Sequence, residues 1–415
     1  MTSSCVVVGD ALLDPATGET AGPAAVVIDN GRVTAAGRRE AVSFPRDAQV
    51  VDGAGLTLLP GLIDTHVHLS MRGDGINMQE LLMTHPSLAV LGAVPACAAT
   101  LNAGFTTVRD AGYTPAGVRQ AVERGYFPGP RMLLTISMLC QTGGHGDNIF
   151  PCGAAIPIAA GALIPESMVD GADEMRKRVR TILREGADWV KICTSGGVMS
   201  PGDPDAPHHP HFTLAEIRAA VEEAGAQGRK VMAHAQSTLG IKNALEGGVA
   251  TIEHGIWLDD DAIAFMAAED RALVPTLVAV LAVIRHAEAG RMPPWAGPKA
   301  KLVSADHKAS VTRAIEAGVT VALGTDSGIG PHGGNGEELL LLQEAGLSPL
   351  DCVRAATSVA ADVIGLSGQA GTLRAGAFGD VIGVRGDPLD DLAALAAPEN
   401  VRVVVKGGAV VKQPG

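Results

Sequence analysis

Residues 60–70 read PGLIDTHVHLS, a short apolar run that ends in two histidines. If residues 62–68 form a β-strand, His66 and His68 point to one face and Val67 to the other, because side chains alternate along a strand. Two imidazoles side by side at the end of a strand can hold one metal ion. The pattern is weak by itself. The 12 histidines in 415 residues give roughly 0.35 such pairs by chance, and His209 and His211 form a second pair among prolines.

Beyond residue 60, short β-prone runs alternate with amphipathic stretches. The runs lie at 106–110, 189–193, 230–235, 251–255, 273–277 and 320–326. Helical patterns lie between them, for example at 172–186 and 214–228, and both of these end in glycine. Repeated strand–helix units predict an α/β fold with a parallel sheet.

Both ends of the sequence are β-rich instead. Runs at 5–8, 25–28 and 33–36 come first, with a hairpin turn DNGR at 29–32, and β-prone runs return at 378–386 and 399–412. A length of 415 residues fits a barrel of about 250 residues plus a smaller domain. We therefore expect a (β/α)8 TIM-like barrel at 60–368, beside a small β-sandwich built from 1–59 and 369–415.

The charge and composition exclude several classes of function. The net charge is −13 without a basic cluster, which argues against nucleic acid and anionic membranes as partners. The sequence contains no apolar run long enough to span a membrane and no signal-like start. The six cysteines form no CxxC pair, which is typical of reduced thiols in a cytoplasmic protein.

Four more residues strengthen the case for a metal centre. Lys191, His234, His254 and Asp326 each lie late in a strand-like run, where barrel enzymes place their chemistry. A lone histidine there is most often structural, and a lone aspartate is most often a helix N-cap. A buried lysine is harder to explain, because burying its charge is costly. Together with His66 and His68, the four predict a metal-binding site.

The sequence also resembles the amidohydrolase superfamily over nearly its whole length. The matching motifs are LPGLIDTHVHLS (59–70), AGFTTVRDAG (103–112), TGGHGD (142–147), WVKICTSGG (189–197), IEHG (252–255), LGTDSG (323–328) and GTLRAGAFGDVIGVRGDPLDD (371–391). The closest likeness is to the Xaa-Pro dipeptidase-like and imidazolonepropionase-related branch. That branch includes enzymes acting on dipeptides, on N-acyl amino acids and on ochratoxin.

The resemblance implies a binuclear metal centre. His66, His68 and Asp326 would hold one divalent ion, His234 and His254 the second, and Lys191, carboxylated by CO2, would bridge both. A lysine amine near two cations should lose its proton, and the neutral amine can take up CO2. Such a ligand set suits Zn²⁺, and Mn²⁺ or Co²⁺ would also fit.

The implied activity is hydrolysis of the amide bond of a small-molecule substrate, a dipeptide or an N-acyl amino acid, by a metal-bridging hydroxide. Asp326 would carry the proton to the leaving nitrogen, and His145 would donate to the substrate carbonyl. Candidate substrate contacts are His145, Gln236, His211, His332 and Arg109. Gln236 and His211 depart from the family pattern, which has an aromatic or imidazole group at the first position and an amide at the second.

Two kinds of alternative stay open. On the same fold, the site could cleave cyclic amides, lactones or phosphotriesters, although deaminases and imidazolonepropionase lack the bridging lysine. A non-catalytic scaffold protein would be expected to lose metal ligands, whereas all six positions here carry competent donors. From its relatives we also expect a homo-oligomer.

Overall fold

The strands of this protein fall into one mixed sheet and two parallel sheets. The computed structural model describes residues 4–147, 149, 152–155 and 163–414. Within these residues the sheets have eight, five and three strands. The predicted α/β class with β-rich ends is confirmed.

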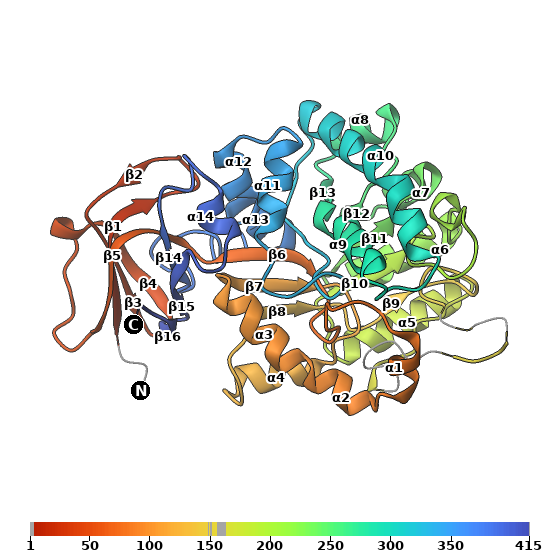
Figure 1. Ribbon diagram of the computed structural model, residues 1–415, viewed down its shortest axis with the longest axis horizontal. Helices are drawn as coiled ribbons and strands as arrows, with labels where there is room; N and C mark the ends of the chain where they lie inside the picture. The colour runs from red at the N-terminus through yellow and green to blue at the C-terminus, as the bar shows by residue number, and fades with distance from the viewer. Residues whose placement is uncertain (1–3, 148, 150–151, 156–162, 415) are drawn as a thin grey trace.

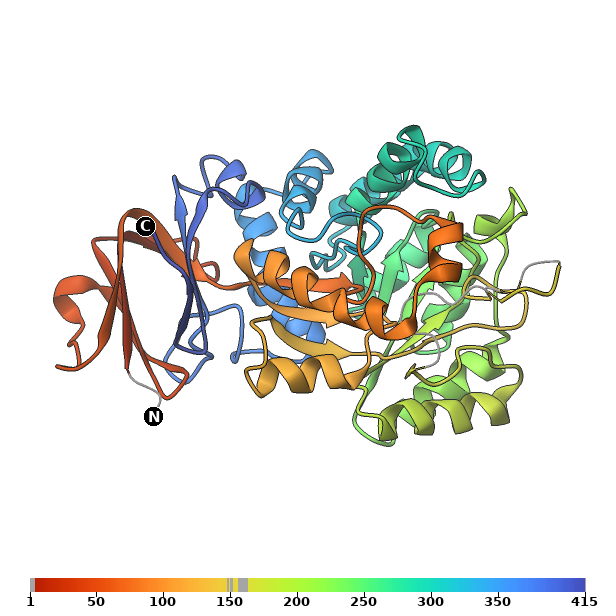
Figure 2. The same ribbon diagram turned by 60° about the horizontal axis from the view of Figure 1, so that its bottom comes forward.

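The eight-stranded sheet combines strands from the beginning and the end of the sequence, at one end of the molecule (Figures 1 and 2). Its strands are β1 (Cys5–Leu13), β2 (Thr20–Ala21), β3 (Ala24–Asp29), β4 (Arg32–Arg38), β5 (Gln49–Pro60), β14 (Val381–Arg385), β15 (Val401–Lys406) and β16 (Ala409–Lys412). They run in the order β16-β15-β14-β5-β1-β3-β4, with β2 beside β1. The predicted sandwich stays a prediction, and the strands that would form it follow one continuous hydrogen-bonded path. The long strand β5 makes this possible, because it pairs with both β1 and β14.

The predicted hairpin at 29–32 joins β3 to β4. Asn30 and Gly31 have positive φ angles of 49° and 76°, the backbone that a tight two-residue hairpin turn requires. Asp29 pairs with Arg32 across the turn, so the turn residues set the register of this edge of the sheet.

The two parallel sheets form the second part of the molecule. The three-stranded sheet contains β6 (Leu62–Val67), β7 (Phe105–Asp110) and β8 (Arg131–Leu134). The five-stranded sheet contains β9 (Met138–Leu139), β10 (Trp189–Cys193), β11 (Lys230–Ala235), β12 (Thr251–His254) and β13 (Ala272–Val274). Residues 135–137 lead from β8 into β9. At the opposite edges, residues 321–327 bridge the sheets, because Val321 pairs with Leu273 and Ser327 pairs with Val67, both in parallel.

Helices connect these strands, and the predicted helices at 172–186 and 214–228 are confirmed as α5 and α6. The helices are α1 (Met78–Met83), α2 (Pro86–Leu91), α3 (Ala93–Asn102), α4 (Ala116–Glu123), α5 (Ala172–Arg184), α6 (Leu214–Gly225), α7 (Thr238–Glu246), α8 (Asp260–Ala268), α9 (Leu277–Glu288), α10 (Ala296–Glu316), α11 (Glu337–Glu344), α12 (Pro349–Ala355), α13 (Ser358–Ile364) and α14 (Ala393–Ala396), with 3-10 turns at Arg39–Ala41 and Ala206–His208. Helix α6 begins with a capping box between Thr213 and Glu216. Among the described helices, none has the length and apolar character needed to cross a bilayer.

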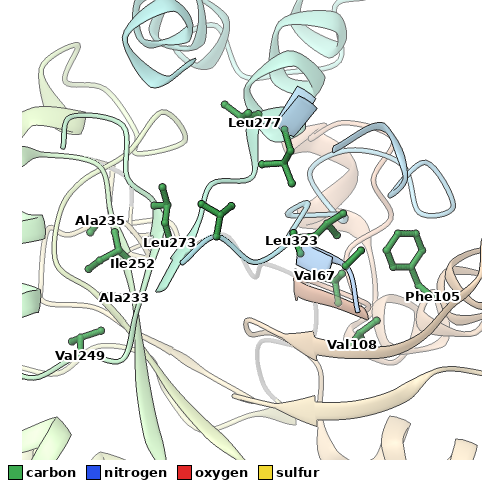
Figure 3. Close-up of a cluster of buried hydrophobic side chains, with 14 of the residues drawn as sticks. Val67, Phe105, Val108, Ala233, Ala235, Val249, Ile252, Leu273, Leu277 and Leu323 are labelled. Carbon is green, nitrogen blue, oxygen red and sulfur yellow. The ribbon is translucent and has the colours of Figure 1, made fainter. Parts of the chain in front are cut away.

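Aliphatic side chains of the parallel strands make the main core. Figure 3 shows Val67 and Val108 from β6 and β7, with Ala233, Ala235 and Ile252 from β11 and β12, all fully buried. Each fully buried Val, Leu or Ile contributes about 1.5–3 kcal/mol. Because side chains alternate along a strand, residues next to these core positions face the other side, and several of them are the candidate site residues.

Candidate metal centre

One cavity opens where the parallel strands end. It encloses about 1110 Å³, counting the part open to solvent, and all six predicted metal ligands line it. They come from β6, β10, β11, the end of β12 and the segment after residue 321. The carboxyl ends of parallel strands meet at one edge, so residues far apart in sequence come together there.

His66, His68 and Asp326 form the tightest group in this cavity. One possible ligand atom from each lies within 4.8 Å of the others. The Oδ1 atom of Asp326 is 3.1 Å from Nε2 of His68 and 3.5 Å from Nε2 of His66. Such a cluster of two imidazole nitrogens and one carboxylate oxygen matches the ligands that zinc and similar ions prefer.

Neighbouring groups hold both imidazoles in the orientation that a ligand needs. Nδ1 of His66 lies 2.7 Å from a carboxylate oxygen of Glu253, and Nδ1 of His68 lies 3.0 Å from the carbonyl oxygen of Gly112. Because a carbonyl oxygen only accepts, Nδ1 of His68 carries a hydrogen, and Nε2 is the ring atom that faces Asp326 and could bind a metal ion. The contact with Glu253 favours the same tautomer in His66.

Asp326 owes its position to the buried carboxylate of Asp64. One oxygen of Asp64 accepts from the backbone N–H groups of His66 and Thr325, and the other accepts from the Thr325 hydroxyl at 2.6 Å and from Asn335 at 2.7 Å. Asp326 itself has a φ of 56°. Backbone strain of this kind is typical of functional sites and persists only where surrounding contacts enforce it.

His234 and His254 form a second group beside the first. Their rings lie 4.7 Å apart between centroids, and His254 lies 5.2 Å from His66. Nε2 of His234 is 3.1 Å from the carbonyl oxygen of Gly196, so it carries the hydrogen and leaves Nδ1 as the possible ligand. Nδ1 of His254 is 2.7 Å from the Thr276 hydroxyl, which leaves Nε2 for the cavity.

Lys191 is the residue that most needs a ligand. Its side chain is 1 % exposed and its Nζ atom has no hydrogen-bond partner among the described residues. Burial lowers the pKa of this amine, because a low-dielectric surrounding disfavours the charged form. A buried, unpartnered amine with a lowered pKa, between two groups of metal-type ligands, fits a lysine that is carboxylated and bound to metal.

The protonation states of the other groups also suit metal ions. Burial lowers the pKa of His66, His234 and His254 well below the ordinary value, so these imidazoles are neutral at pH 7. Burial alone would raise the pKa of Asp326. The hydrogen bond with His68 and the nearby His66 and Lys191 outweigh burial and hold that pKa below its usual range. Burial alone would lower the pKa of His68, but the hydrogen bond and the charge of Asp326 raise it. The site therefore offers three neutral imidazoles and an anionic oxygen, with His68 paired to that oxygen.

His145 lies against the second group. Its ring stacks on His234 with centroids 3.9 Å apart, and its Nδ1 is 3.0 Å from the Ser200 hydroxyl. Gly197 makes this stack possible, because a Cβ there would lie 2.7 Å from the His145 ring and 2.8 Å from the His234 ring. Burial, with the neighbouring His211 and Lys191, lowers the pKa of His145 to about 3, so the ring is a neutral donor at pH 7.

The other predicted substrate contacts divide into two groups. Gln236 lines the cavity, and its Oε1 accepts from the backbone N–H of Val198 at 3.2 Å. His211, His332 and Arg109 are absent from the described lining. Nε2 of His332 instead bonds to the carbonyl oxygen of Met71 at 2.7 Å.

Arg109 in particular has a different role from the predicted substrate contact. It is fully buried and donates to the carbonyl oxygen of Thr65 at 2.7 Å and to Glu253 at 3.0 Å. Glu253 in turn contacts His66. Arg109 therefore contacts Glu253, which orients His66, and it supports the orientation of this proposed ligand indirectly.

Three residues near the site were missed in the sequence. Glu253 and Asp64 orient the first group, and Tyr113, with a φ of 70°, lines the cavity 5.8 Å from His68 between ring centroids. Glu253 and Asp64 lie inside IEHG and LIDTHVH, so the motifs contained a signal. An acidic residue beside a histidine ligand is a frequent orienting partner.

The fold and the site together define a hydrolase of the amidohydrolase class. A sequence model of the amidohydrolase family matches residues 57–411, so the chain belongs to that family and is an enzyme acting on amide bonds. The predicted family branch is also confirmed by named relatives.

Among these relatives, the ochratoxinase of Aspergillus niger is 32 % identical, covering 97 % of this chain and 86 % of its own length. A solved prolidase complexed with N-methylphosphonate-L-proline has a TM-score of 0.90 at 36 % identity, over 99 % of this chain and 100 % of that one. A solved Xaa-Pro dipeptidase with bound methionine has a TM-score of 0.89 at 29 % identity, over 99 % of this chain and 100 % of that one.

Proposed function

We propose that this protein hydrolyses an amide bond with the help of two divalent metal ions. The observation that carries the proposal is the convergence of six donor side chains on one cavity, with the amine of Lys191 buried and unpartnered among them. His66, His68 and Asp326 would hold one ion and His234 and His254 the other. Lys191, once carboxylated, would contact both.

The carboxylation of Lys191 follows from its surroundings. The neutral Nζ attacks the carbon of CO2, forms an N–C bond and releases one proton, which leaves an anionic carbamate with two oxygens. Burial lowers the pKa of this amine, which favours the reaction, because only the neutral amine is a nucleophile. When bound, the two ions supply hydroxide near neutral pH, because they lower the pKa of a shared water.

The protein's own groups then move the proton and hold the carbonyl. Asp326 accepts the proton of the attacking water and passes it to the leaving nitrogen, so that a neutral amine departs. His145, which is neutral and lines the same cavity, donates a hydrogen bond to the carbonyl oxygen as it gains charge.

We also propose that the two parallel sheets close into one (β/α)8 barrel. It is supported by the link from β8 into β9 and by the contacts of residues 321–327 with both remaining sheet edges. We place its limits at residues 60 and 368, with 1–59 and 369–415 forming the β-domain. Homo-oligomer formation and a cytoplasmic location stay predictions from the sequence.

Metal analysis with a substrate screen tests the proposed function. We expect about two metal ions per chain, and cleavage of amides in a panel of N-acyl amino acids, Xaa-Pro dipeptides, neutral amides, lactones and phosphotriesters. Lys191→Ala should lose metal and activity, whereas Lys308→Ala, at an exposed ion pair with Glu344, should keep both. About one metal per chain, with activity only on cyclic amides, would contradict the binuclear proposal.

The proposed function leaves open which acyl group and which amine flank the scissile amide bond. Sequence resemblance predicts a dipeptide or an N-acyl amino acid, and the prolidase and dipeptidase relatives support an amide with an amino acid leaving group. Such a leaving group carries a free carboxylate next to the scissile bond. The residues of the cavity wall decide whether the site can bind that carboxylate.

A further inference from the structure

We propose that the preferred substrate is a neutral amide with apolar groups on both sides of the scissile bond and no carboxylate beside it. The inference rests on the proposed amide hydrolysis and narrows its substrate class. It departs from the amino acid leaving group that the sequence resemblance predicts.

The wall of the cavity is apolar on several sides. Met78 and Leu81 from α1, Met199 from the loop after β10, Val280 from α9, Trp295 before α10 and Ile329 after Asp326 all line it. Polar side chains gather at the floor, where the six proposed ligands lie. A substrate that reaches these ligands therefore has its remaining groups in contact with hydrocarbon and sulfur.

The described lining contains no cation that could pair with a substrate carboxylate. Lys191 is the sole Lys or Arg in that lining, and it belongs to the proposed metal centre. The residues outside the described ranges (1–3, 148, 150–151, 156–162 and 415) include no Arg, Lys or His. A hidden cation in those segments is therefore excluded by composition.

Two buried cations next to residues of the cavity region, Arg109 and Lys299, already have partners. Arg109 donates to Thr65 and Glu253 behind the cavity floor. Lys299 donates to the backbone carbonyl of Ser200 at 2.8 Å. A carboxylate placed against the apolar wall would lose its hydration without gaining a counter-ion, which is strongly unfavourable.

The site does provide a donor for a neutral polar group. Oε1 of Gln236 accepts from the backbone N–H of Val198, which identifies the other end of this amide as its NH2 donor. A neutral carbonyl oxygen is a suitable acceptor for that NH2 group. Gln236 can therefore bind an uncharged amide, carbamate or ketone oxygen, and it adds no positive charge that could pair with a carboxylate.

The mouth of the cavity extends the apolar surface outward. On α1, Met78 and Leu81 line the cavity, whereas Leu82 and Met83 are 53 % and 83 % exposed. Leu88 and Leu91 on α2 are also exposed. A long or bulky apolar group that leaves the cavity along α1 meets these side chains beside the ion pair of Glu80 with Arg72, and exposed apolar patches of this kind mark ligand-binding grooves.

Two amides that differ by one carboxylate test the inference on the metal-loaded protein. They are N-octanoyl-phenethylamine and N-octanoyl-L-phenylalanine. In both, water adds across the C–N bond, which breaks to give octanoic acid and the amine. We expect kcat/KM to be at least about 10-fold higher for the phenethylamide. Equal or better cleavage of the phenylalanine derivative would overturn the inference.

A binding measurement separates this inference from the proposed function. The uncleavable sulfonamides N-octanesulfonyl-phenethylamine and N-octanesulfonyl-L-phenylalanine can be compared by calorimetry. Tighter binding of the neutral compound supports the inference even if neither amide is cleaved, an outcome that would overturn the hydrolysis proposal alone. Tighter binding of the carboxylate overturns the inference while leaving hydrolysis intact.

A cation added to the wall should reverse the preference. Met199→Arg places a guanidinium in the lining and should shift the kcat/KM ratio toward the phenylalanine derivative by about 10-fold or more. Leu302→Arg, on the 61 % exposed position of α10, adds the same charge outside the cavity and should leave the ratio unchanged. If Met199→Arg does not fold, Met78→Arg on α1 replaces it. Equal ratios in the lining variant and in Leu302→Arg would contradict the proposal.

Discussion

The two halves of the proposed metal centre are held in place by different means. His66 and Asp326 depend on buried carboxylates, Glu253 and Asp64, whose oxygens accept several hydrogen bonds each. His234 and His254 depend on a backbone carbonyl and a hydroxyl, and Nζ of Lys191 has no hydrogen-bond partner in the part of the chain that the structure describes. The first half is therefore held by charged networks, whereas the second half has only neutral partners and, under the proposed function, would be completed by carboxylation of Lys191 and by metal binding.

The largest expected effect breaks the first half at its carboxylate. Asp326→Asn should lower kcat on the order of 10⁴-fold, because the amide cannot carry the proton to the leaving nitrogen. The fold should persist, since the contacts of Asp64 with Thr325 and Asn335 are kept. Steady-state kinetics and thermal unfolding check this, with Asp362→Asn at an exposed position of α13 as the control. A near-normal rate would mean that another group moves the proton.

A smaller loss is expected beside the second half. His145→Ala should lower kcat about 10²–10³-fold with little change in KM, because the ring donates to an oxygen that gains charge in the transition state. Metal content should stay the same, since His145 stacks on His234 without replacing it as a ligand. A rise in KM alone would assign His145 to ground-state binding. His209→Ala, which is exposed, should have no effect.

Metal affinity measures the difference between the halves directly. Glu253→Gln should weaken binding at the first half by about 10–100-fold, as expected for loss of a charged orienting partner. Thr276→Val, which removes the hydroxyl beside His254, should weaken the second half less. Competition with a chelator gives the metal affinities of both variants. The midpoint of thermal unfolding shows whether Glu253→Gln also destabilises the fold because Arg109 has lost its charged partner. Equal losses would mean that the two halves are held alike.

The smallest expected effect is on the free energy of unfolding at acid pH, which is measured separately from the loss of metal. Burial, with the neighbouring His209, lowers the pKa of His211 to about 4, against about 6.5 in an unfolded chain. As the pH falls, the unfolded chain takes up a proton on His211 before the folded protein does. The contribution of neutral His211 to the free energy of unfolding is therefore complete above pH 6.5 and is lost as the pH falls toward 4. His211→Gln should therefore retain about 1–2 kcal/mol more of its pH 7 stability near pH 5. Urea unfolding at both pH values, with His209→Gln as the control, measures it. An identical pH dependence in His211→Gln and the unchanged protein would show that His211 does not contribute.

Local patterns explain why much of the site could be predicted from the sequence. The alternation of side chains puts His66 and His68 on one face. Lys191 and His234 lie toward the ends of β10 and β11, and Asp326 lies in the segment after residue 321 that bridges the two parallel sheets. These features need only the period of a strand and the position of its end. The predictions that follow from resemblance, namely metal number and the carbamate, await measurement.

Long-range pairing explains what the sequence could not provide. Glu253 meets His66 across 187 positions, and Asp64 meets Thr325 across 261. No local pattern tells which strand end will face which. Arg109 shows the same limit, because its place at the end of β7 was visible but the direction of its guanidinium depended on Glu253, 144 positions away.

The continuous sheet built from both ends of the sequence has a consequence for synthesis on the ribosome. Strand β5 leads directly into β6, which carries His66 and ends just before His68, yet the partner β14 of β5 is made more than 300 residues later. Until residues 381–412 emerge, the nascent chain holds Leu58 and Leu59 at an unpaired edge, the kind of surface that attracts chaperones and aggregates readily. The first proposed metal ligands to be translated therefore follow directly after a strand, β5, whose second partner is made near the end of synthesis.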